Sequence, residues 1–218
     1  MLEGKKVLVT AGPTQEAIDP VRYIGNHSSG KMGYAIVDSL IEEGAEVILV
    51  TGPTCLKPNQ NAKIEEVTSA QEMYEAVERH IDQMDAYILA AAVADYTPIT
   101  VASQKIKKKK DTFSIELKKT IDIAKTIGES KKESQIAVGF ALETNNEEEN
   151  ARKKLISKNL DFVVLNSMQN KDTCFGGDNN KITILDKENK LEFEAKAKTE
   201  VAKDIVKHVI KIFQKNTV

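Results

Sequence analysis

Short apolar runs alternate with amphipathic runs along most of the 218-residue chain. Such apolar runs predict strands that are covered on both faces, and the alternation predicts βα units in a parallel sheet. The predicted strands are Lys5 to Thr10, Glu46 to Thr51, Ile64 to Val67, Ala86 to Ala91, Ile136 to Ala141 and Phe162 to Asn166. The pattern therefore predicts an α/β fold with a mostly parallel sheet.

Helical spacing of apolar residues marks the segments between these strands. In Lys31 to Glu43 the apolar residues recur every three or four positions, and Gly44 follows as a C-terminal cap. Ser69 and Glu72 form a capping-box pattern that opens a helix reaching about Met84. Further helices are predicted at Asp122 to Ser130, Glu147 to Asn159 and Thr199 to Phe213. Helices that cover both faces of the sheet predict a Rossmann-like, three-layer fold.

Two regions interrupt this alternation. Residues 93–118 contain a lysine-rich run, Lys105 to Lys110, and then the alternating sequence TFSIELK, which predicts a strand over 112–118. Residues 167–196 predict a C-terminal hairpin with strands at Lys181 to Leu185 and Leu191 to Lys196. Neither region has enough apolar residues for a core of its own. We therefore expect one domain over residues 1–218, with the lysine-rich run as a mobile flap.

Composition narrows the function classes. Hydrophobic residues make up 41% and charged residues 29% of the chain, and the formal net charge is -2. This balance is typical of a globular protein and offers no general field for binding a nucleic acid. No apolar run approaches the roughly 20 residues of a membrane span, and the first strand begins too early for a signal peptide. We expect a cytoplasmic protein with no nucleic-acid or membrane partner, in which Cys55 and Cys174 are unpaired thiols.

A long polar loop follows the first predicted strand, with the sequence AGPTQEAIDPVRYIGNHSSGKMG over residues 11–33. Open parallel sheets bind ligands at the carboxyl ends of their strands, and Ser28 to Gly33 open a helix whose backbone N–H groups can bind an anion. Asn26 has donors and an acceptor, so it can hold a carboxylate or an oxyanion. The alternatives are a glycine turn that packs a helix on a strand, and an Asn that stabilises its own turn.

Polar clusters after later strands predict the rest of a site. The sequence AAVADYTP, residues 91–98, combines small residues with Asp95, which can accept hydrogen bonds from hydroxyls, help to hold a metal, or cap a turn. Lys154 and Lys158 lie one turn apart on a helix, where they can hold a phosphate chain or form a solvated face. The KIKKKK run can close on a triphosphate or stay solvated. The sequence has no Ser-His-Asp, zinc or Walker pattern.

In order and spacing, these motifs resemble those of phosphopantothenoylcysteine synthetase, the ligase half of the bacterial coenzyme A biosynthesis flavoprotein. The resemblance covers Lys5 to Asn166. It rests on the loop sequence of residues 11–33, on AAVADYTP at 91–98, on KIKK, on GFALETNN and on the helix that reaches Lys158. It implies that CTP, accompanied by Mg²⁺, activates 4′-phosphopantothenate as an acyl-cytidylate, after which the amine of L-cysteine displaces CMP. It also implies a homodimer, and no FMN, because the family's flavin-containing decarboxylase half is missing.

The resemblance implies roles for individual residues. As catalytic residues, Asn26 would hold the carboxylate and the acyl-cytidylate, and Lys105 would stabilise charge on the nucleotide phosphates. Arg22 would reach the phosphopantothenate of the neighbouring subunit. The substrate would also contact Ser28, Ser29, Gly30, Ala91 and Ala92. The nucleotide would contact Asp95, Asp122, Ile123, Phe140, Lys154 and Lys158 as well as Lys105. The metal ligands stay unassigned.

One stretch departs from the family pattern, and two other functions fit parts of the sequence. Where the family usually has Asn-Pro-Asp-Ile, this chain has Thr-Ile-Asp-Ile at 120–123, so we expect Asp122 and Ile123 to match the family better than Ile121. A nicotinamide-dependent Rossmann reductase shares the strand, glycine turn and helix, but the full glycine fingerprint and a Tyr-x-x-x-Lys pair are lacking. A non-catalytic nucleotide-binding module is the other alternative.

Overall fold

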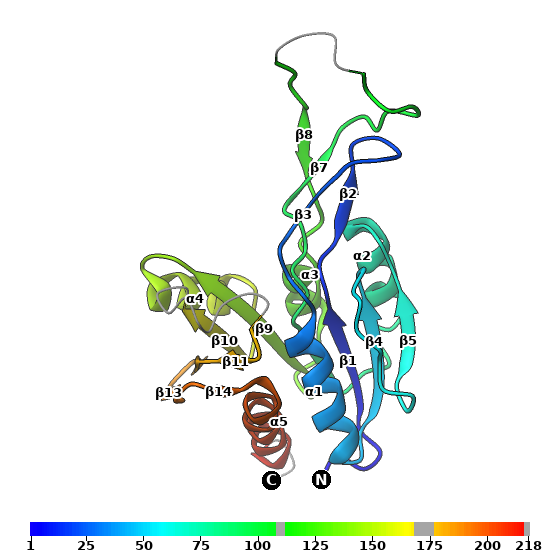
Figure 1. The fold of residues 1–218 in the computed structure, drawn as a ribbon. Helices are drawn as coiled ribbons and strands as arrows, with labels where there is room; N and C mark the ends of the chain where they lie inside the picture. The colour runs from blue at the N-terminus through cyan, green and yellow to red at the C-terminus, as the bar shows by residue number, and fades with distance from the viewer. Residues whose placement is uncertain (108–111, 168–176, 216–218) are drawn as a thin grey trace.

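The computed structural model describes residues 1–107, 112–167 and 177–215, and within them an eight-stranded sheet forms the centre of the molecule (Figure 1). The strand order is β13-β12-β10-β9-β6-β1-β4-β5. The six strands from β10 to β5 in this order are parallel, and β12 and β13 extend one edge as an antiparallel pair. The parallel strands are β1 (Lys6–Ala11), β4 (Glu46–Thr51), β5 (Lys63–Glu66), β6 (Ala86–Leu89), β9 (Ile136–Glu143) and β10 (Phe162–Ser167). The prediction of a mostly parallel sheet is confirmed.

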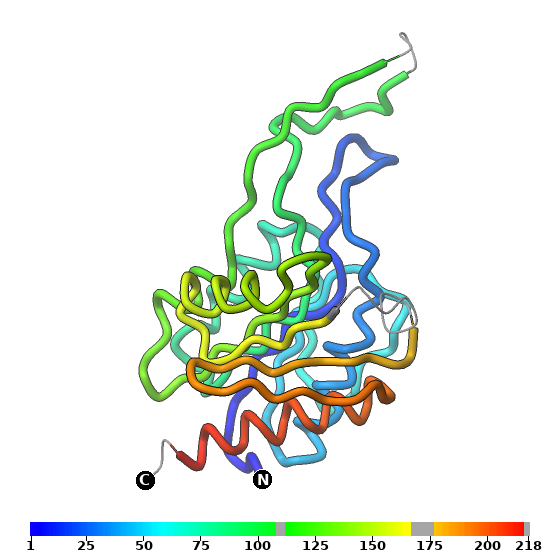
Figure 2. Tube along the Cα trace, turned by 90° about the vertical axis from the view of Figure 1, so that its left-hand side faces the viewer, coloured from blue at the N-terminus to red at the C-terminus, as the bar shows by residue number. Residues whose placement is uncertain are grey.

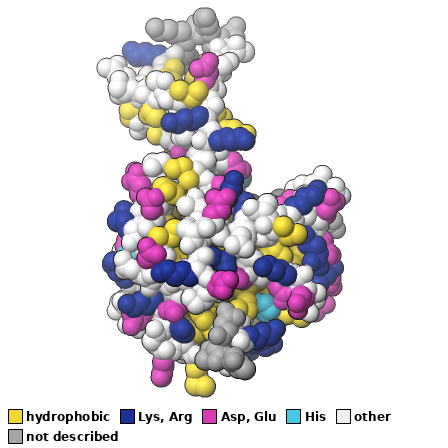
Figure 3. Space-filling model, turned by 180° about the vertical axis from the view of Figure 1, so that it is seen from behind, with side chains coloured by type: hydrophobic (Ala, Val, Ile, Leu, Met, Phe, Trp, Pro, Cys, Tyr) yellow, Lys and Arg dark blue, Asp and Glu magenta, His cyan; other side chains and the backbone are white. Residues whose placement is uncertain are grey.

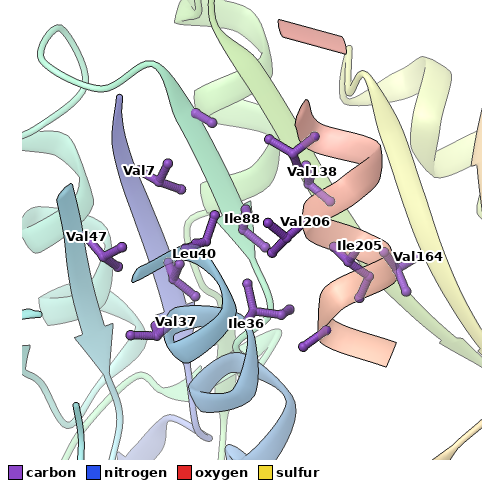
Figure 4. Packing of buried hydrophobic residues seen from close by; sticks show 14 of the residues in the cluster. Val7, Ile36, Val37, Leu40, Val47, Ile88, Val138, Val164, Ile205 and Val206 are labelled. Atoms are coloured by element: carbon purple, nitrogen blue, oxygen red, sulfur yellow. The ribbon is translucent and has the colours of Figure 1, made fainter. Parts of the chain in front are cut away.

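Helices cover both faces of the sheet. One face packs against α1 (Lys31–Glu42) and α5 (Lys198–Lys215). The other packs against α2 (Ala70–Glu78), α3 (Ile123–Ser130) and α4 (Glu147–Ser157). Successive side chains of a strand point to opposite faces, and accordingly Val7 of β1 joins the first core and Leu8 joins the second. Figure 4 shows strand residues of the first core pointing toward α1 and α5. The three-layer prediction is confirmed.

Glycines bring α1 against the end of β1. Gly30 precedes the helix with φ 79°, and a Cβ there would lie 2.9 Å from Thr54 Cγ2. A Cβ on Gly33 would lie 2.5 Å from the Cβ of Ala11. Only glycine accommodates both the left-handed backbone and these close approaches. The first turn of α1 therefore starts directly at the carboxyl end of β1.

A two-part arm projects beyond the carboxyl ends of the parallel strands (Figures 1 and 2). One part is the hairpin of β2 (Gln15–Ala17) and β3 (Tyr23–Gly25). The other contains the antiparallel strands β7 (Tyr96–Pro98) and β8 (Leu117–Lys119). The Ala102 N–H donates to the Ile18 carbonyl at 3.0 Å, which joins the two parts. We call residues 15–25, 96–107 and 112–119 the arm.

Several predicted elements differ in extent from the observed ones. In the predicted strand at 112–118 only the end is paired, as β8, because just three residues lie opposite β7. The helix α2 ends at Glu78 rather than near Met84, and hydrogen-bonded turns follow it as the chain bends back toward the sheet. Of the lysine-rich run, residues 108–110 lie outside the described residues, so its predicted mobility stays a prediction.

The C-terminal hairpin is present but its second strand is interrupted. The pair β12 (Ile182–Asp186) and β13 (Lys190–Glu192) forms the hairpin. The next short strand, β14 (Lys196–Ala197), pairs instead with β11 (Asn179–Asn180), because the chain leaves the sheet edge to enter α5. Cys55 is an exposed thiol, and Cys174 lies outside the described residues. No helix in the described ranges is long and apolar enough to cross a membrane.

Candidate active site

The loops after β1 and β6 lie side by side where the strand order reverses. From β1 the chain passes to β4 on one side, and the later strands β6 and β9 follow on the other side. The Ala92 N–H donates to the Gly12 carbonyl at 2.9 Å, and the Thr14 N–H donates to the Ala92 carbonyl at 3.2 Å. Asn26 Nδ2 also donates to the Ala92 carbonyl, at 3.0 Å. This is the place where open parallel sheets bind ligands, and the structure brings Asn26 and Ala92 together there.

Two adjacent cavities open at this rim of the sheet. The first has a volume of about 430 Å³ and the second about 290 Å³. They share the lining residues Ala91, Val93, Asp95, Phe140 and Lys154. Since five residues line both, a ligand with two parts can occupy the two cavities together.

The first cavity extends toward α3 and contains three more of the predicted nucleotide residues, Asp122, Ile123 and Lys158. Lys158 Nζ lies 2.8 Å from Asp122 Oδ2, and Asp122 also caps α3 by accepting the Lys125 N–H at 3.0 Å. Burial acts to raise the pKa of Asp122, but the hydrogen bonds from Lys158 and Lys125 outweigh it and lower that pKa. Asp122 therefore stays ionised and pairs with Lys158 at the wall of the cavity.

Lys154 lies at the junction of the two cavities. Its Nζ donates to the Phe140 carbonyl at 2.5 Å. Burial lowers the pKa of Lys154, and the charge of Lys158 lowers it further, against the opposite effect of nearby carboxylates including Asp95. A partly desolvated ammonium group at a cavity wall interacts strongly with an anion, because little water screens the charge. Lys154 is thus the best placed cation for a phosphate that enters from either cavity.

The second cavity is built on the N-terminus of α1. Its lining includes Ser28, Ser29 and Gly30, together with Ala92. Gly30 is the N-cap residue, and as a glycine it has no side chain with which to cap the helix. The first backbone N–H groups of α1 therefore point to a place where an anion is favoured by about 0.3–1 kcal/mol from the helix dipole. Lys31 beside them pairs with Asp178 at 2.7 Å.

Sequence reasoning missed part of the second cavity. Asn180 and Lys198 line its far wall, and Asn180 Nδ2 donates to Asn166 Oδ1 at 3.0 Å. Asn166 is the last residue of the strand predicted at Phe162 to Asn166, so the sequence already places it near this rim. Asn180 and Lys198 had no such signal, because they come from β11 and the start of α5, which cross to this rim from the other end of the sequence.

Three predicted residues line neither cavity. Asn26 is beside the second cavity, because it bonds to the carbonyl of Ala92, which lines that cavity. Arg22 and Lys105 are on the arm and line neither cavity. Arg22 is held there by Asp19, with NH2 2.5 Å from Asp19 Oδ2. Within residues 1–107, 112–167 and 177–215, no group of three or more His, Cys, Asp or Glu side chains is arranged to hold a metal ion.

A mostly parallel sheet with a cationic, two-part cleft at its switch point defines an α/β protein suited to phosphorylated ligands. The family model described as the DNA/pantothenate metabolism flavoprotein C-terminal domain matches residues 2–213, and the chain belongs to this family. This membership confirms the resemblance that the loop motifs indicated.

Similar proteins agree with this assignment. A protein named cysteine/cysteine sulfinic acid decarboxylase, from an unknown prokaryotic organism, is 49% identical over 96% of this chain and 59% of its own length. The coenzyme A biosynthesis bifunctional protein CoaBC of Bacillus subtilis is 48% identical over 95% of this chain and 52% of its own length. The chain spans about half the length of the curated relatives it matches. A crystal structure of the C-terminal domain of CoaBC is 44% identical, with a TM-score of 0.83 and 98% of both chains covered.

Proposed function

We propose that the chain is a phosphopantothenate–cysteine ligase of coenzyme A biosynthesis that uses CTP. The observation that carries the proposal is the pair of cavities that meet at Ala91, Asp95, Phe140 and Lys154. Acyl activation by a nucleotide needs two ligands whose reacting ends touch, and adjacent cavities with a cation at their junction supply this arrangement. The similarity to the C-terminal domain of CoaBC supports the same function.

In the proposed reaction, the carboxylate of 4′-phosphopantothenate attacks the α-phosphorus of CTP. Pyrophosphate leaves, and the product is the mixed anhydride, the acyl-cytidylate. The neutral amine of L-cysteine then attacks the acyl carbon, CMP leaves with the bonding electron pair, and the amine gives up a proton as the amide forms. Both steps need neutralisation of phosphate charge and stabilisation of an oxyanion more than they need a strong base.

The nucleotide would occupy the first cavity. Asp122, Ile123 and Lys158 lie at its far end, and Asp95, Phe140 and Lys154 lie at the junction. Lys154 would neutralise the phosphate at which the carboxylate attacks, since burial makes its charge effective there. Incoming phosphate would also raise the lowered pKa of Lys154 and keep it protonated.

The acyl group would lie in the second cavity. Ala91 and Ala92 are small enough to let the substrate approach the backbone, and Ser28, Ser29 and Gly30 surround the N-terminus of α1. The bond to the Ala92 carbonyl uses one N–H of Asn26, and an amide has a second N–H and an oxygen with which to hold the carboxylate or the acyl-cytidylate. Lys105 would act on the nucleotide phosphates from the arm.

Mg²⁺ would enter with the triphosphate. Mg²⁺ in such sites commonly takes one or two protein carboxylates, with phosphate oxygens and water completing its octahedron. Asp95, which lines both cavities, fits that limited role. In this proposal the flavin chemistry of longer family members needs no residue of this chain, so no FMN is assigned to it.

The second subunit of a homodimer would use the arm. Apolar side chains gather there on the face shown in Figure 3, and the exposed ones on the arm include Val21, Tyr23, Ile99 and Phe113, each more than half exposed. Exposed apolar patches of this kind mark interaction surfaces. A symmetric contact through the two arms would bring Arg22 to the partner's phosphopantothenate, which explains why Arg22 lies outside its own cavities.

The test is a product assay with purified protein. CTP with 4′-phosphopantothenate and Mg²⁺ should release pyrophosphate, and added L-cysteine should release CMP with formation of the amide. CTP binding without CMP release in the complete mixture would favour a non-catalytic nucleotide module. Nicotinamide binding with no response to CTP would favour a reductase. Loss of CO₂ from cysteine would assign to this chain the activity in the name of the 49% identical relative.

A further inference from the structure

Asp19 is a fully buried carboxylate in the middle of the arm, in the turn between β2 and β3. Its side chain is 0% exposed. Oδ1 accepts the backbone N–H groups of Val21 at 2.9 Å and Arg22 at 3.0 Å. Oδ2 accepts Arg22 Nε at 3.1 Å and the Arg22 terminal nitrogen NH2 at 2.5 Å. Two guanidinium nitrogens thus share one carboxylate oxygen in charge-assisted hydrogen bonds, which orient the guanidinium group.

The same carboxylate holds the second part of the arm. Asp19 Oδ2 accepts the Ile106 N–H at 3.1 Å, and the Arg22 NH2 donates back to the Ile106 carbonyl, also at 3.1 Å. Ile106 directly follows Lys105 in the chain. One carboxylate therefore joins the β2–β3 turn, the Arg22 side chain and the backbone next to Lys105.

We call the contacts of Asp19 with Arg22 and with the backbone of Ile106 the clamp, and charge stabilises it. The Arg22 guanidinium beside Asp19 holds the pKa of that carboxyl well below its usual range, against the opposite effect of burial. Asp19 therefore stays ionised at neutral pH and keeps its contacts with Arg22 and Ile106. The Arg22 side chain remains 41% exposed, and its bonds to Asp19 and Ile106 use Nε and NH2. The other terminal nitrogen of the guanidinium can still reach a phosphate.

We propose that Asp19 is a positioning residue for the ligase reaction, which fixes Arg22 for the phosphate of the substrate and sets the place of Lys105 through the backbone of Ile106. The inference rests on the proposed function, in which Arg22 and Lys105 contact substrates while Asp19 contacts neither. Asp19 thereby links, within one subunit, a residue that serves the partner's substrate and a residue that serves the nucleotide.

The first experiment compares Asp19→Asn with Asp161→Asn. Asp161 is a matched control, because its carboxylate also accepts a backbone N–H, from Ala137 at 2.7 Å, and pairs with Lys131 at 3.1 Å, but outside the lining of both cavities. Asp19→Asn should raise the KM for 4′-phosphopantothenate and lower kcat, with a combined loss of about 10²-fold in kcat/KM, since misplacement by about 1 Å has that effect. Asp161→Asn should leave both constants unchanged. Equal kinetic losses in the two variants would overturn the proposal.

A double-mutant cycle separates positioning from general stability. If Asp19 acts through Arg22, Asp19→Asn should change the KM for 4′-phosphopantothenate much less in an Arg22→Ala background than in the wild type. Likewise, Asp19→Asn should lower kcat less in a Lys105→Ala background than it does in the wild type. Effects that simply multiply in both backgrounds would show that Asp19 does not act through these residues, and would overturn the proposal.

Hydrogen exchange tests the clamp without the reaction. In Asp19→Asn the amide hydrogen of Ile106 should exchange faster than in the wild type. The amides of β1 and β6 should keep their wild-type exchange rates, and a cooperative melting transition should show that the variant is folded. Unchanged exchange at Ile106 would overturn the clamp even if activity falls. If wild-type protein forms no CMP, the ligase function fails, and faster exchange at Ile106 would then support the clamp alone without its role in that reaction.

Discussion

The rim of the sheet and the arm hold the charged residues of the candidate site in different ways. At the rim, Lys154 and Lys158 line a formed cavity and are held by the Phe140 carbonyl and by Asp122. On the arm, Arg22 and Lys105 line neither cavity, and the Arg22 guanidinium lies over the ring of the exposed Phe113. The described residues of one chain thus form a two-part cleft at the rim, while Arg22 and Lys105 on the arm line no part of it. This contrast fits a site shared between subunits.

We expect the largest effect on activity from a substitution of Lys154, which lies partly desolvated at the junction of the two cavities. Lys154→Met removes the cation at the junction of the two cavities while keeping a long side chain. We expect kcat/KM for CMP formation to fall roughly 10²–10³-fold, as when one group that stabilises charge in the transition state is lost. Steady-state CMP release measures this loss, and the melting temperature should change little, because a partly desolvated charge is also removed.

Lys153→Met is the matched control for Lys154→Met. Lys153 is the preceding residue of α4, its side chain is 68% exposed, and it pairs with Glu149 at 2.7 Å. An exposed pair of this kind contributes little, so activity should stay close to that of the wild type. A similar loss of activity in both variants would mean that helix charge in general, and not the junction, matters.

The next largest effect is expected for Asn26→Asp. The new carboxylate would repel both the Ala92 carbonyl, which Asn26 now contacts at 3.0 Å, and the substrate carboxylate. We expect about a 10²-fold loss of CMP formation. Measuring pyrophosphate and CMP separately shows whether activation or cysteine transfer stalls. Pyrophosphate and CMP release at wild-type rates would remove Asn26 from the acyl site.

The rim was more predictable from sequence than the arm, for physical reasons. Buried strands such as Ala86 to Leu89 have apolar runs, and the polar residues that follow them must meet at one edge of a parallel sheet. The β2–β3 part of the arm has strands of three residues with mixed polarity, for example Tyr23–Gly25, so it offers no periodic signal. The alternating segment 112–118 did offer one, but only its end is paired. The role of Asp19 also had no signal in the sequence, because its partner Ile106 lies in a distant irregular segment. Motif resemblance, rather than periodicity, pointed to Arg22 and Lys105.

Subunit complementation tests directly whether the arm serves a neighbouring rim. Arg22→Ala and Lys154→Met should each have an activity that is measurable but far below a quarter of that of the wild type. In a mixed dimer, the intact Lys154 of one subunit would meet the intact Arg22 of the other, which restores one site. Random exchange of subunits in a two-fold dimer should therefore recover roughly a quarter of wild-type activity. No recovery, with mixed dimers detected by mass spectrometry, would place Arg22 in the site of its own chain.

The smallest effect is expected for Asp122→Asn at the exposed end of the rim. Asp122 is 44% exposed, and solvent screening limits its pair with Lys158 to at most about 1 kcal/mol. The Asn side chain can still cap α3, so the melting temperature at neutral pH should fall only slightly, through the loss of this pair. The folded-state pKa of Asp122 is lowered, so the stability from this pair is present above the unfolded pKa and is lost as pH falls through the folded one.

The pH dependence of Asp122→Asn therefore differs from that of the wild type only in acid, below the ordinary Asp pKa of 3.8. Thermal melts between neutral pH and strong acid should converge for the two proteins as the wild-type carboxylate is protonated. CTP affinity at neutral pH should change by less than about threefold, since Lys158 loses a competing carboxylate while the cleft keeps Lys154. A loss as large as that of Lys154→Met would show that the exposed end of the rim matters as much as the junction, and would reverse the order argued from burial.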